Sequence, residues 1–91
     1  MRIMYSILNI LHSNSVKGRL SALTRKEIQK LLDANGEKWN ERTIYNYLRK
    51  LEDLNYIETG LKRSNATTFY INPEGIAWMK GIEEERPGES G

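Results

Sequence analysis

Cysteine is absent from the 91-residue chain, and proline and histidine are scarce, with two prolines and one histidine. The absence of cysteine excludes a disulfide scaffold, a thiolate metal site and a cysteine nucleophile, and it fits a reducing compartment. The one histidine, His12, has no neighbouring ligand motif, so we expect it to cap a helix or face solvent. No Gly-rich phosphate loop and no Ser-His-Asp arrangement occurs. The sequence therefore predicts a cytoplasmic protein that is not an enzyme and has no metal or cofactor site.

Long hydrophobic runs are also absent. The most apolar segment, residues 1–11, is interrupted by Arg2, Ser6 and Asn9. It is too short to cross a bilayer and lacks a small-residue cleavage site, so neither a membrane helix nor a signal peptide is predicted. Hydrophobic residues make up 38% of the chain and charged residues 29%, which is the composition of one soluble globular domain.

Charge is distributed unevenly along the chain. The net charge is +2, but residues 83–91 hold four Glu and one Arg, a net of −3, which leaves +5 for residues 1–82. We therefore divide the chain into a basic domain, residues 1–82, and an acidic flexible tail, residues 83–91. A basic domain favours an anionic partner.

Four segments combine the apolar spacing of helices with residues that cap helix ends. The second opens with Thr24 and Glu27, a capping box in which each residue satisfies a free amide group of the other. Asn35-Gly36 can supply the left-handed conformation that ends this helix. The fourth opens with Asn72-Pro73-Glu74, an N-cap followed by proline and an acid. The predicted helices cover residues 2–12, 24–36, 40–55 and 72–82.

The third helix has the clearest core face. Trp39 and Ile44 flank its N-cap, Asn40, in the arrangement of a hydrophobic staple. Asn55 can take the left-handed conformation at the other end. Between them, the apolar side runs through Ile44, Tyr47, Leu48, Leu51 and Leu54.

Three extended segments are predicted. We expect a brief strand at Arg19–Ser21 and a β-hairpin formed by Tyr56–Thr59 and Thr67–Ile71, with a basic, polar tip between them. The second and third helices are joined by a short Gly-containing turn, as in helix-turn-helix units. In such units the second helix enters the DNA major groove by its N-terminal turns.

The face of the third helix that the core does not use carries a second stripe, formed by Arg42, Tyr45, Asn46 and Arg49. Arginine can donate two hydrogen bonds to guanine, and asparagine can pair bidentately with adenine. Tyr45 is suited to a thymine methyl group or to a phosphate oxygen. An ordinary solvated helix face is the alternative interpretation of each residue.

Further positive charges fall on elements expected to share that face. Arg25 and Lys26 lie in the first turn of the second helix, where the helix dipole disfavours cations and a nearby phosphate would offset the mismatch. Lys62 and Arg63 lie at the hairpin tip. Phosphate contacts of this kind supply affinity and position without sequence discrimination.

The stretch ERTIYNYLRKLEDLNYIET, followed by KRSNATTFYINPEGIAWM, resembles winged helix-turn-helix transcriptional regulators of the broad MarR- and PadR-like group. Thr43-Ile44, Leu48, Leu51-Glu52 and Tyr56-Ile57 match the family's pattern, and Asn55 stands where the family has glycine. The resemblance implies an α+β fold with a three-helix core, a small antiparallel β-hairpin wing and a C-terminal helix.

The resemblance also implies sequence-specific binding of double-stranded DNA. The recognition helix, residues 41–54, would lie in the major groove, and the wing, residues 60–67, on the backbone or in the minor groove. The residues assigned to DNA are Arg42, Thr43, Tyr45, Asn46, Arg49, Arg25, Lys26, Lys62 and Arg63. The alternative is a winged-helix module that docks an acidic protein and does not bind DNA.

A homodimer is the expected state, because the first and last helices of the resembling regulators often pack across a two-fold axis. Two recognition helices would then meet half-sites about one turn of DNA apart. Met4, Tyr5 and Trp78 are the candidate contacts. A place in the core of the monomer is the alternative for these three residues.

Overall fold

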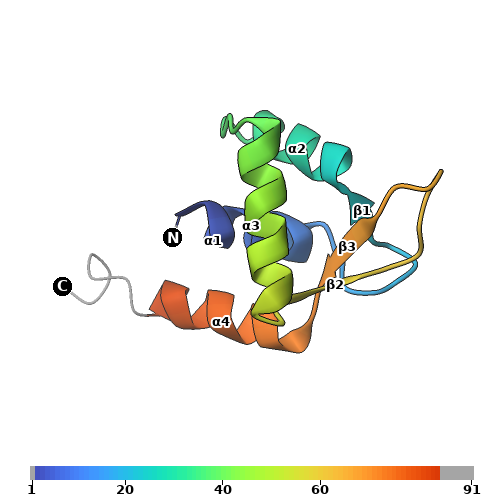
Figure 1. Ribbon diagram of the computed structural model, residues 1–91. Helices are drawn as coiled ribbons and strands as arrows, with labels where there is room; N and C mark the ends of the chain where they lie inside the picture. The colour runs from blue at the N-terminus through green and yellow to red at the C-terminus, as the bar shows by residue number, and fades with distance from the viewer. Residues whose placement is uncertain (1, 85–91) are drawn as a thin grey trace.

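Four helices and three short strands make up the computed structural model, which describes residues 2–84 (Figure 1). In chain order they are α1 (Arg2–Ser13), β1 (Leu23–Thr24), α2 (Arg25–Ala34), α3 (Glu41–Asp53), β2 (Ile57–Thr59), β3 (Thr68–Ile71) and α4 (Pro73–Glu84). The predicted α+β winged-helix architecture is confirmed: α1, α2 and α3 form the helical core, the β2–β3 hairpin is the wing, and α4 follows it.

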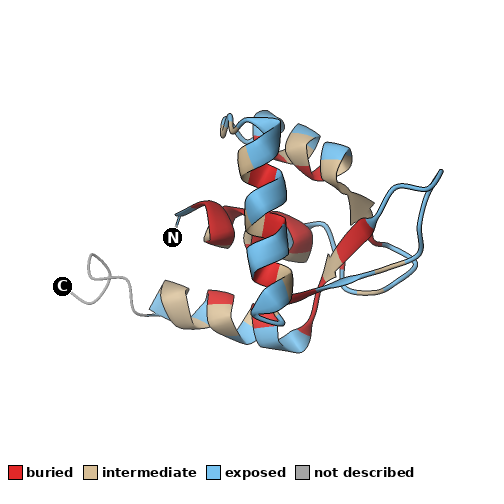
Figure 2. Cartoon of the chain, in the orientation of Figure 1, coloured by how far each residue is buried: buried red, intermediate tan, exposed pale blue. Residues whose placement is uncertain are grey.

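The first helix, α1, lies at the centre of the core. Seven of its twelve residues are buried, and Ile7, Leu8 and Leu11 are fully enclosed. It contacts α2, α3, α4 and β3, and Figure 2 shows buried residues along most of its length. Met4 belongs to this core and is only 4% exposed, which is the alternative to a dimer contact that the sequence left open for it.

The first strand lies further along the chain than the sequence predicted. Arg19–Ser21 form a turn, and the strand is β1, in which Leu23 pairs with Phe69 and Thr24 with Thr68. Thr24 is also the N-cap of α2, with φ −75° and ψ 165°. An N-cap residue has extended backbone angles, so the strand can pass directly into the helix. Pairing with β3, which lies about 45 residues away in sequence, sets this position.

The predicted capping box of α2 is confirmed. The Glu27 amide donates to Thr24 Oγ1 at 3.2 Å, and the Thr24 amide donates to Glu27 Oε1 at 2.9 Å. At the other end, Gly36 has φ 81° and takes the left-handed conformation, whereas Asn35 has φ −86° and does not. A glycine adopts this conformation without a steric penalty, which explains why α2 ends here.

The third predicted helix, α3, begins as predicted, with Asn40 Oδ1 accepting a hydrogen bond from the Thr43 amide at 2.7 Å. Its buried residues are Ile44, Leu48 and Leu51. The assignment of Leu54 to the core is wrong, because its side chain is 45% exposed. The chain reverses at Asn55, which has φ 66°, and Ile57 reaches the core instead.

The wing is the hairpin between β2 and β3, and β3 is the middle strand of an antiparallel sheet with the order β1-β3-β2. At its tip, the backbones of Arg63 and Ala66 exchange two hydrogen bonds of 3.1 and 2.8 Å. Ser64 and Asn65 between them have φ 49° and 69°. Positive φ at both central residues defines a type I′ turn, whose twist matches that of the paired strands.

The base of the wing is pressed against the segment that precedes β1. A Cβ atom on Gly60 would lie 2.6 Å from the Ala22 Cβ and 2.7 Å from the Arg19 carbonyl oxygen. The Leu61 amide donates to the same carbonyl at 3.3 Å. Because only glycine allows this approach, the position of the wing relative to the helical core is determined at its base.

The last helix, α4, is capped by Asn72, whose Oδ1 accepts a hydrogen bond from the Gly75 amide at 2.8 Å. Trp78 stacks on Tyr56 with 5.3 Å between ring centroids, so its indole is part of the monomer's packing. The helix continues through Glu84, two residues beyond the predicted end of the domain. The rest of the predicted acidic tail, residues 85–91, lies outside the described residues. No helix within residues 2–84 has both the length and the hydropathy that crossing a membrane requires.

Candidate nucleic-acid interface

The outer face of α3 contributes four exposed side chains to the candidate interface. Arg42, Tyr45, Asn46 and Arg49 are all exposed, opposite the buried Ile44, Leu48 and Leu51, and the outward side of α3 in Figure 2 is mostly exposed. Thr43, which the sequence assigned to the DNA backbone, is half-buried beside the N-cap. The structure therefore presents the predicted stripe to solvent.

Two residues of this stripe contact each other. Arg49 Nη1 donates a hydrogen bond to the Tyr45 hydroxyl at 3.1 Å, and its guanidinium carbon lies 5.9 Å from the centroid of the Tyr45 ring. This hydrogen bond raises the pKa of Arg49 above its ordinary value. The Arg49 guanidinium is thus held one helical turn along from Tyr45 while it remains exposed.

Arg25 brings the N-terminus of α2 to the same place. Its guanidinium carbon lies 6.0 Å from the Tyr45 centroid, and its Nη2 lies 3.4 Å from Glu41 Oε2. The Nε atom of Arg25 is buried and has no hydrogen-bond partner in the described part of the chain. One positive charge from α2 is therefore fixed beside the first turns of α3.

The two basic residues at the wing tip have different surroundings. Arg63 folds back onto the protein: Nη1 donates to Glu27 Oε2 at 2.9 Å and Nη2 donates to the Ala22 carbonyl at 2.7 Å. Lys62 is exposed and forms no ion pair with any residue in 2–84, and the same is true of Lys26 in α2. Lys62 and Lys26 are thus available to an anionic partner, whereas Arg63 ties the wing to α2.

The Glu27 carboxylate accepts the Arg63 hydrogen bond that links the wing to α2. Its pKa lies below the ordinary value of 4.5, first because the Thr24 amide donates to it and also because Arg63 is close. A single carboxylate thus completes the capping box of α2 and holds the wing.

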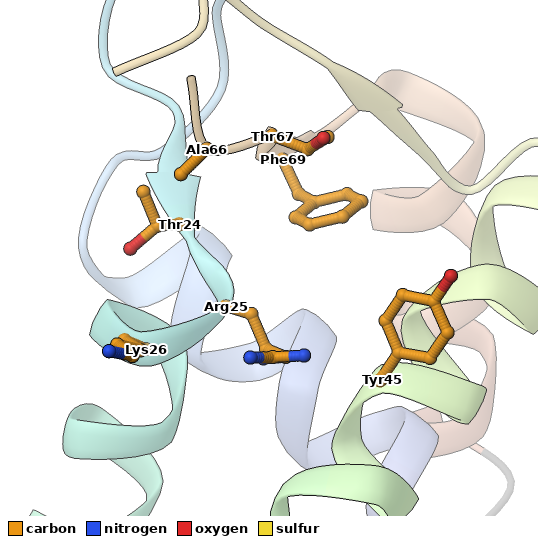
Figure 3. A pocket seen from close by; sticks show the side chains of 7 residues that line it. All are labelled: Thr24, Arg25, Lys26, Tyr45, Ala66, Thr67 and Phe69. Atoms are coloured by element: carbon orange, nitrogen blue, oxygen red, sulfur yellow. The ribbon is translucent and has the colours of Figure 1, made fainter. Parts of the chain in front are cut away.

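A hollow separates α3 from the wing and the start of α2. It has a volume of about 340 Å³, and Figure 3 shows the Arg25 guanidinium and the rings of Tyr45 and Phe69 around it. A second, more open hollow of about 520 Å³ is also bordered by Tyr45 and is lined by Arg49, Glu52 and Asp53 among others. Tyr45, Thr67 and Phe69 border both hollows, so we describe the two hollows together as one groove.

No family model matches the chain. A curated protein, the DNA-binding protein TubR of Clostridium botulinum C phage, is 31% identical to it over 78 residues, which are 86% of this chain and 90% of that protein. The chain belongs to the TubR family. The solution structure of the DNA-binding TubR fragment from Clostridium botulinum superimposes with a TM-score of 0.62 at 30% identity and covers 87% of this chain and 91% of that one. The narrower MarR- or PadR-like grouping stays a prediction.

Two contributors to the groove in this TubR-family chain were not singled out from its sequence. Both residues were assigned to a predicted strand, and Phe69 is indeed a buried core residue, but both also border the two hollows. Thr67 immediately precedes β3, and Phe69 lies within it. Alternate residues of an extended segment point to the same face, so Thr67 and Phe69 share one side and Tyr70 lies on the other. That alternation would have placed both residues on one face of the hairpin. Within residues 2–84, no cluster of three or more His, Cys, Asp or Glu side chains has a geometry suited to a metal ion.

Proposed function

We propose that this TubR-family protein binds double-stranded DNA sequence-specifically and acts as a small regulator. The observation that supports this most is that the exposed face of α3 carries Arg42, Tyr45, Asn46 and Arg49 while the opposite face alone holds the helix to the core. The fold does not need these four side chains. Arginine and asparagine are the residues that pair bidentately with guanine and adenine in the major groove. The name of the TubR relative, a DNA-binding protein, agrees with this assignment.

The proposed roles divide between bases and backbone. Arg42, Asn46 and Arg49 face base edges in the major groove, and Lys26, Lys62, Thr43 and Arg25 hold phosphates. Arg63, which the sequence also assigned to the backbone, is bound to Glu27 and Ala22, so we now propose that it positions the wing. The wing then lies on the backbone or in the minor groove through Lys62.

Homodimer formation is a second part of the proposal, together with a cytoplasmic location and a role in transcription without catalysis. Met4 is buried, and the Tyr5 hydroxyl donates to Glu83 Oε2 at 2.6 Å, so α1 offers little to a partner. The outer side of α4, next to the half-buried Trp78, is the more accessible part of the predicted contact. Sedimentation of the free protein and of its complex with duplex DNA would measure whether one or two chains bind per site.

The experiment that tests DNA binding begins with selection from a random-sequence duplex library. The selected site and a scrambled duplex are then titrated with the full chain at several salt concentrations. The logarithm of the binding constant should fall linearly with the logarithm of salt concentration, by about 0.9 for each phosphate contacted, and the selected site should bind more tightly than the scrambled one. No retention of any duplex at low salt would overturn the proposal and leave the protein-interaction module as the function to test.

A further inference from the structure

The Tyr45 side chain stands between two arginines that come from different helices. Arg25 reaches it from the first turn of α2 and Arg49 from the next turn of α3, at 6.0 and 5.9 Å from the ring centroid. A guanidinium within about 6 Å of an aromatic centroid is attracted by the ring quadrupole. Tyr45 thus gathers two positive charges that are 24 positions apart in the sequence.

The polar end of Tyr45 is engaged within the protein. Its hydroxyl oxygen accepts the hydrogen bond from Arg49 Nη1 at 3.1 Å. Tyr45 is 41% exposed and borders both hollows of the groove. A thymine methyl group or a phosphate, the partners expected for Tyr45 from the sequence, would have to reach a side chain whose neighbours are already two guanidinium groups.

The two hollows that Tyr45 borders differ in the charged residues that line them. On the Arg25 side, Glu41 lies 3.4 Å from the Arg25 guanidinium, but that hollow also holds Lys26, which forms no ion pair within residues 2–84 and favours a phosphate there. The hollow on the Arg49 side also holds Glu52 and Asp53, which repel phosphate. Arg49, which is flanked by these acids, is therefore better suited to a base edge than to a phosphate. At a base edge it binds by donating hydrogen bonds and does not depend on neutralising a negative charge.

We propose that Tyr45 is a positioning residue for DNA binding: its ring holds Arg25 toward a backbone phosphate, and its ring and hydroxyl hold Arg49 toward a base edge. This inference rests on the proposed function. Long arginine side chains lose much rotamer freedom when they bind a partner, and a ring that holds them beforehand reduces that loss. The effect of Tyr45 on affinity therefore passes through the two arginines and not through a contact of its own.

The test is a pair of double-mutant cycles on the selected duplex and on a scrambled duplex, at a low salt concentration where weak variants still bind. Tyr45→Leu removes the ring and the hydroxyl, and it should weaken binding to the selected site about tenfold in the wild-type background. In the Arg25→Ala, Arg49→Ala background the same substitution should change affinity by less than about twofold.

Tyr45→Phe separates the two contacts. It keeps the ring beside Arg25 and removes the acceptor for Arg49, so affinity for the scrambled duplex should stay unchanged. Affinity for the selected site should fall about threefold, and this loss should disappear in the Arg49→Ala background. Tyr70→Phe is the matched control, because it removes a tyrosine hydroxyl that donates to Glu58 at 3.0 Å on the other face of β3. It should leave both affinities unchanged.

A Tyr45→Leu loss of equal size in both backgrounds would overturn the inference, since Tyr45 would then contact DNA directly. In that case the wild-type protein still binds its selected site, and the proposed function stands. If the wild-type protein retained no duplex at low salt, the proposed function and this inference would both be wrong. Thermal unfolding of each variant checks that the exposed Tyr45 position leaves the fold intact.

Discussion

Two helices of nearly equal length, α1 with twelve residues and α3 with thirteen, have opposite relations to the rest of the molecule. Seven residues of α1 are buried and only three of α3. Both helices have an apolar stripe, but α1 contains one permanently charged residue, Arg2, whereas α3 contains six charged residues. The lesson is that charge content, more than the apolar stripe, distinguishes a helix that is enclosed by its neighbours from a helix that presents a face.

The largest expected effect is on stability and comes from α1. Leu8→Ala removes a fully buried side chain at the centre of the core and should lower the free energy of unfolding by about 2–5 kcal/mol. Arg42→Ala, on the exposed face of α3, is the control and should change it by less than about 0.5 kcal/mol. Urea denaturation of the two variants measures the difference. Similar midpoints would mean that α1 and α3 do not differ in the way their burial indicates.

The next effect is on DNA binding and comes from α3. Arg49→Ala should weaken binding to the selected site by about 1–3 kcal/mol and relax the preference at one base pair, without a change in stability. Lys50→Ala removes the same charge from the neighbouring position, which lies outside the stripe, and should have a smaller, sequence-independent effect. Titration of the selected site and its single-base variants distinguishes the two. Equal losses for both variants would show that α3 contributes only charge.

The wing allows a comparison between two neighbouring basic residues: Arg63, which is bound within the protein, and Lys62, which is exposed. Lys62→Ala should weaken binding to all duplexes alike and make the salt slope shallower by about one. Arg63→Ala removes the bonds to Glu27 and Ala22 and should lower the free energy of unfolding by about 1 kcal/mol, with little change in the salt slope. Salt titrations and urea denaturation are both needed. An equal change in salt slope for the two variants would mean that Arg63 leaves Glu27 when DNA binds.

The smallest effect concerns acid stability. The pKa of Glu27 is lowered in the folded state, so its ionised form contributes stability above the unfolded-state pKa, and this contribution is lost as the pH falls through the folded-state value. Glu27→Gln can still form the capping box but does not titrate. The variant should lose less stability than the wild type between about pH 6 and pH 3. Urea midpoints at the two pH values test this, and parallel losses would show that Glu27 is not coupled to folding.

Local chemistry explains most of what could be predicted of the fold. The N-caps Thr24, Asn40 and Asn72 depend on hydrogen bonds to amides three residues further on, so sequence alone reveals them. The two-residue strand β1 depends on pairing with β3, and its position could not be derived locally. Leu54 was misplaced because the spacing of α3 continues up to it, while the chain has already left the core.

The candidate site was predictable to the extent that helical spacing determines it. The stripe on α3 follows from positions three and four apart. The surroundings of Arg25 and Arg63 do not, because their partners lie on other elements: Arg25 pairs with Glu41 and Arg63 with Glu27, 16 and 36 positions away. The sequence therefore shows which cationic side chains are present, but not which of them form ion pairs within the protein.

The attachment of the wing has a consequence for the length of the DNA site. Gly60 presses the base of the hairpin against Ala22, and Arg63 ties its tip to Glu27 and to the Ala22 carbonyl. As long as these contacts persist, we expect the distance from the wing tip to α3 to stay fixed. If α3 and the wing both contact DNA as proposed, inserting one base pair between their contacts would move the two parts of the site out of register. The duplex would then have to untwist or bend to keep both contacts, and the deformation energy would depend on its stiffness. The spacing within the site should thus be conserved more strictly than the bases that fill it.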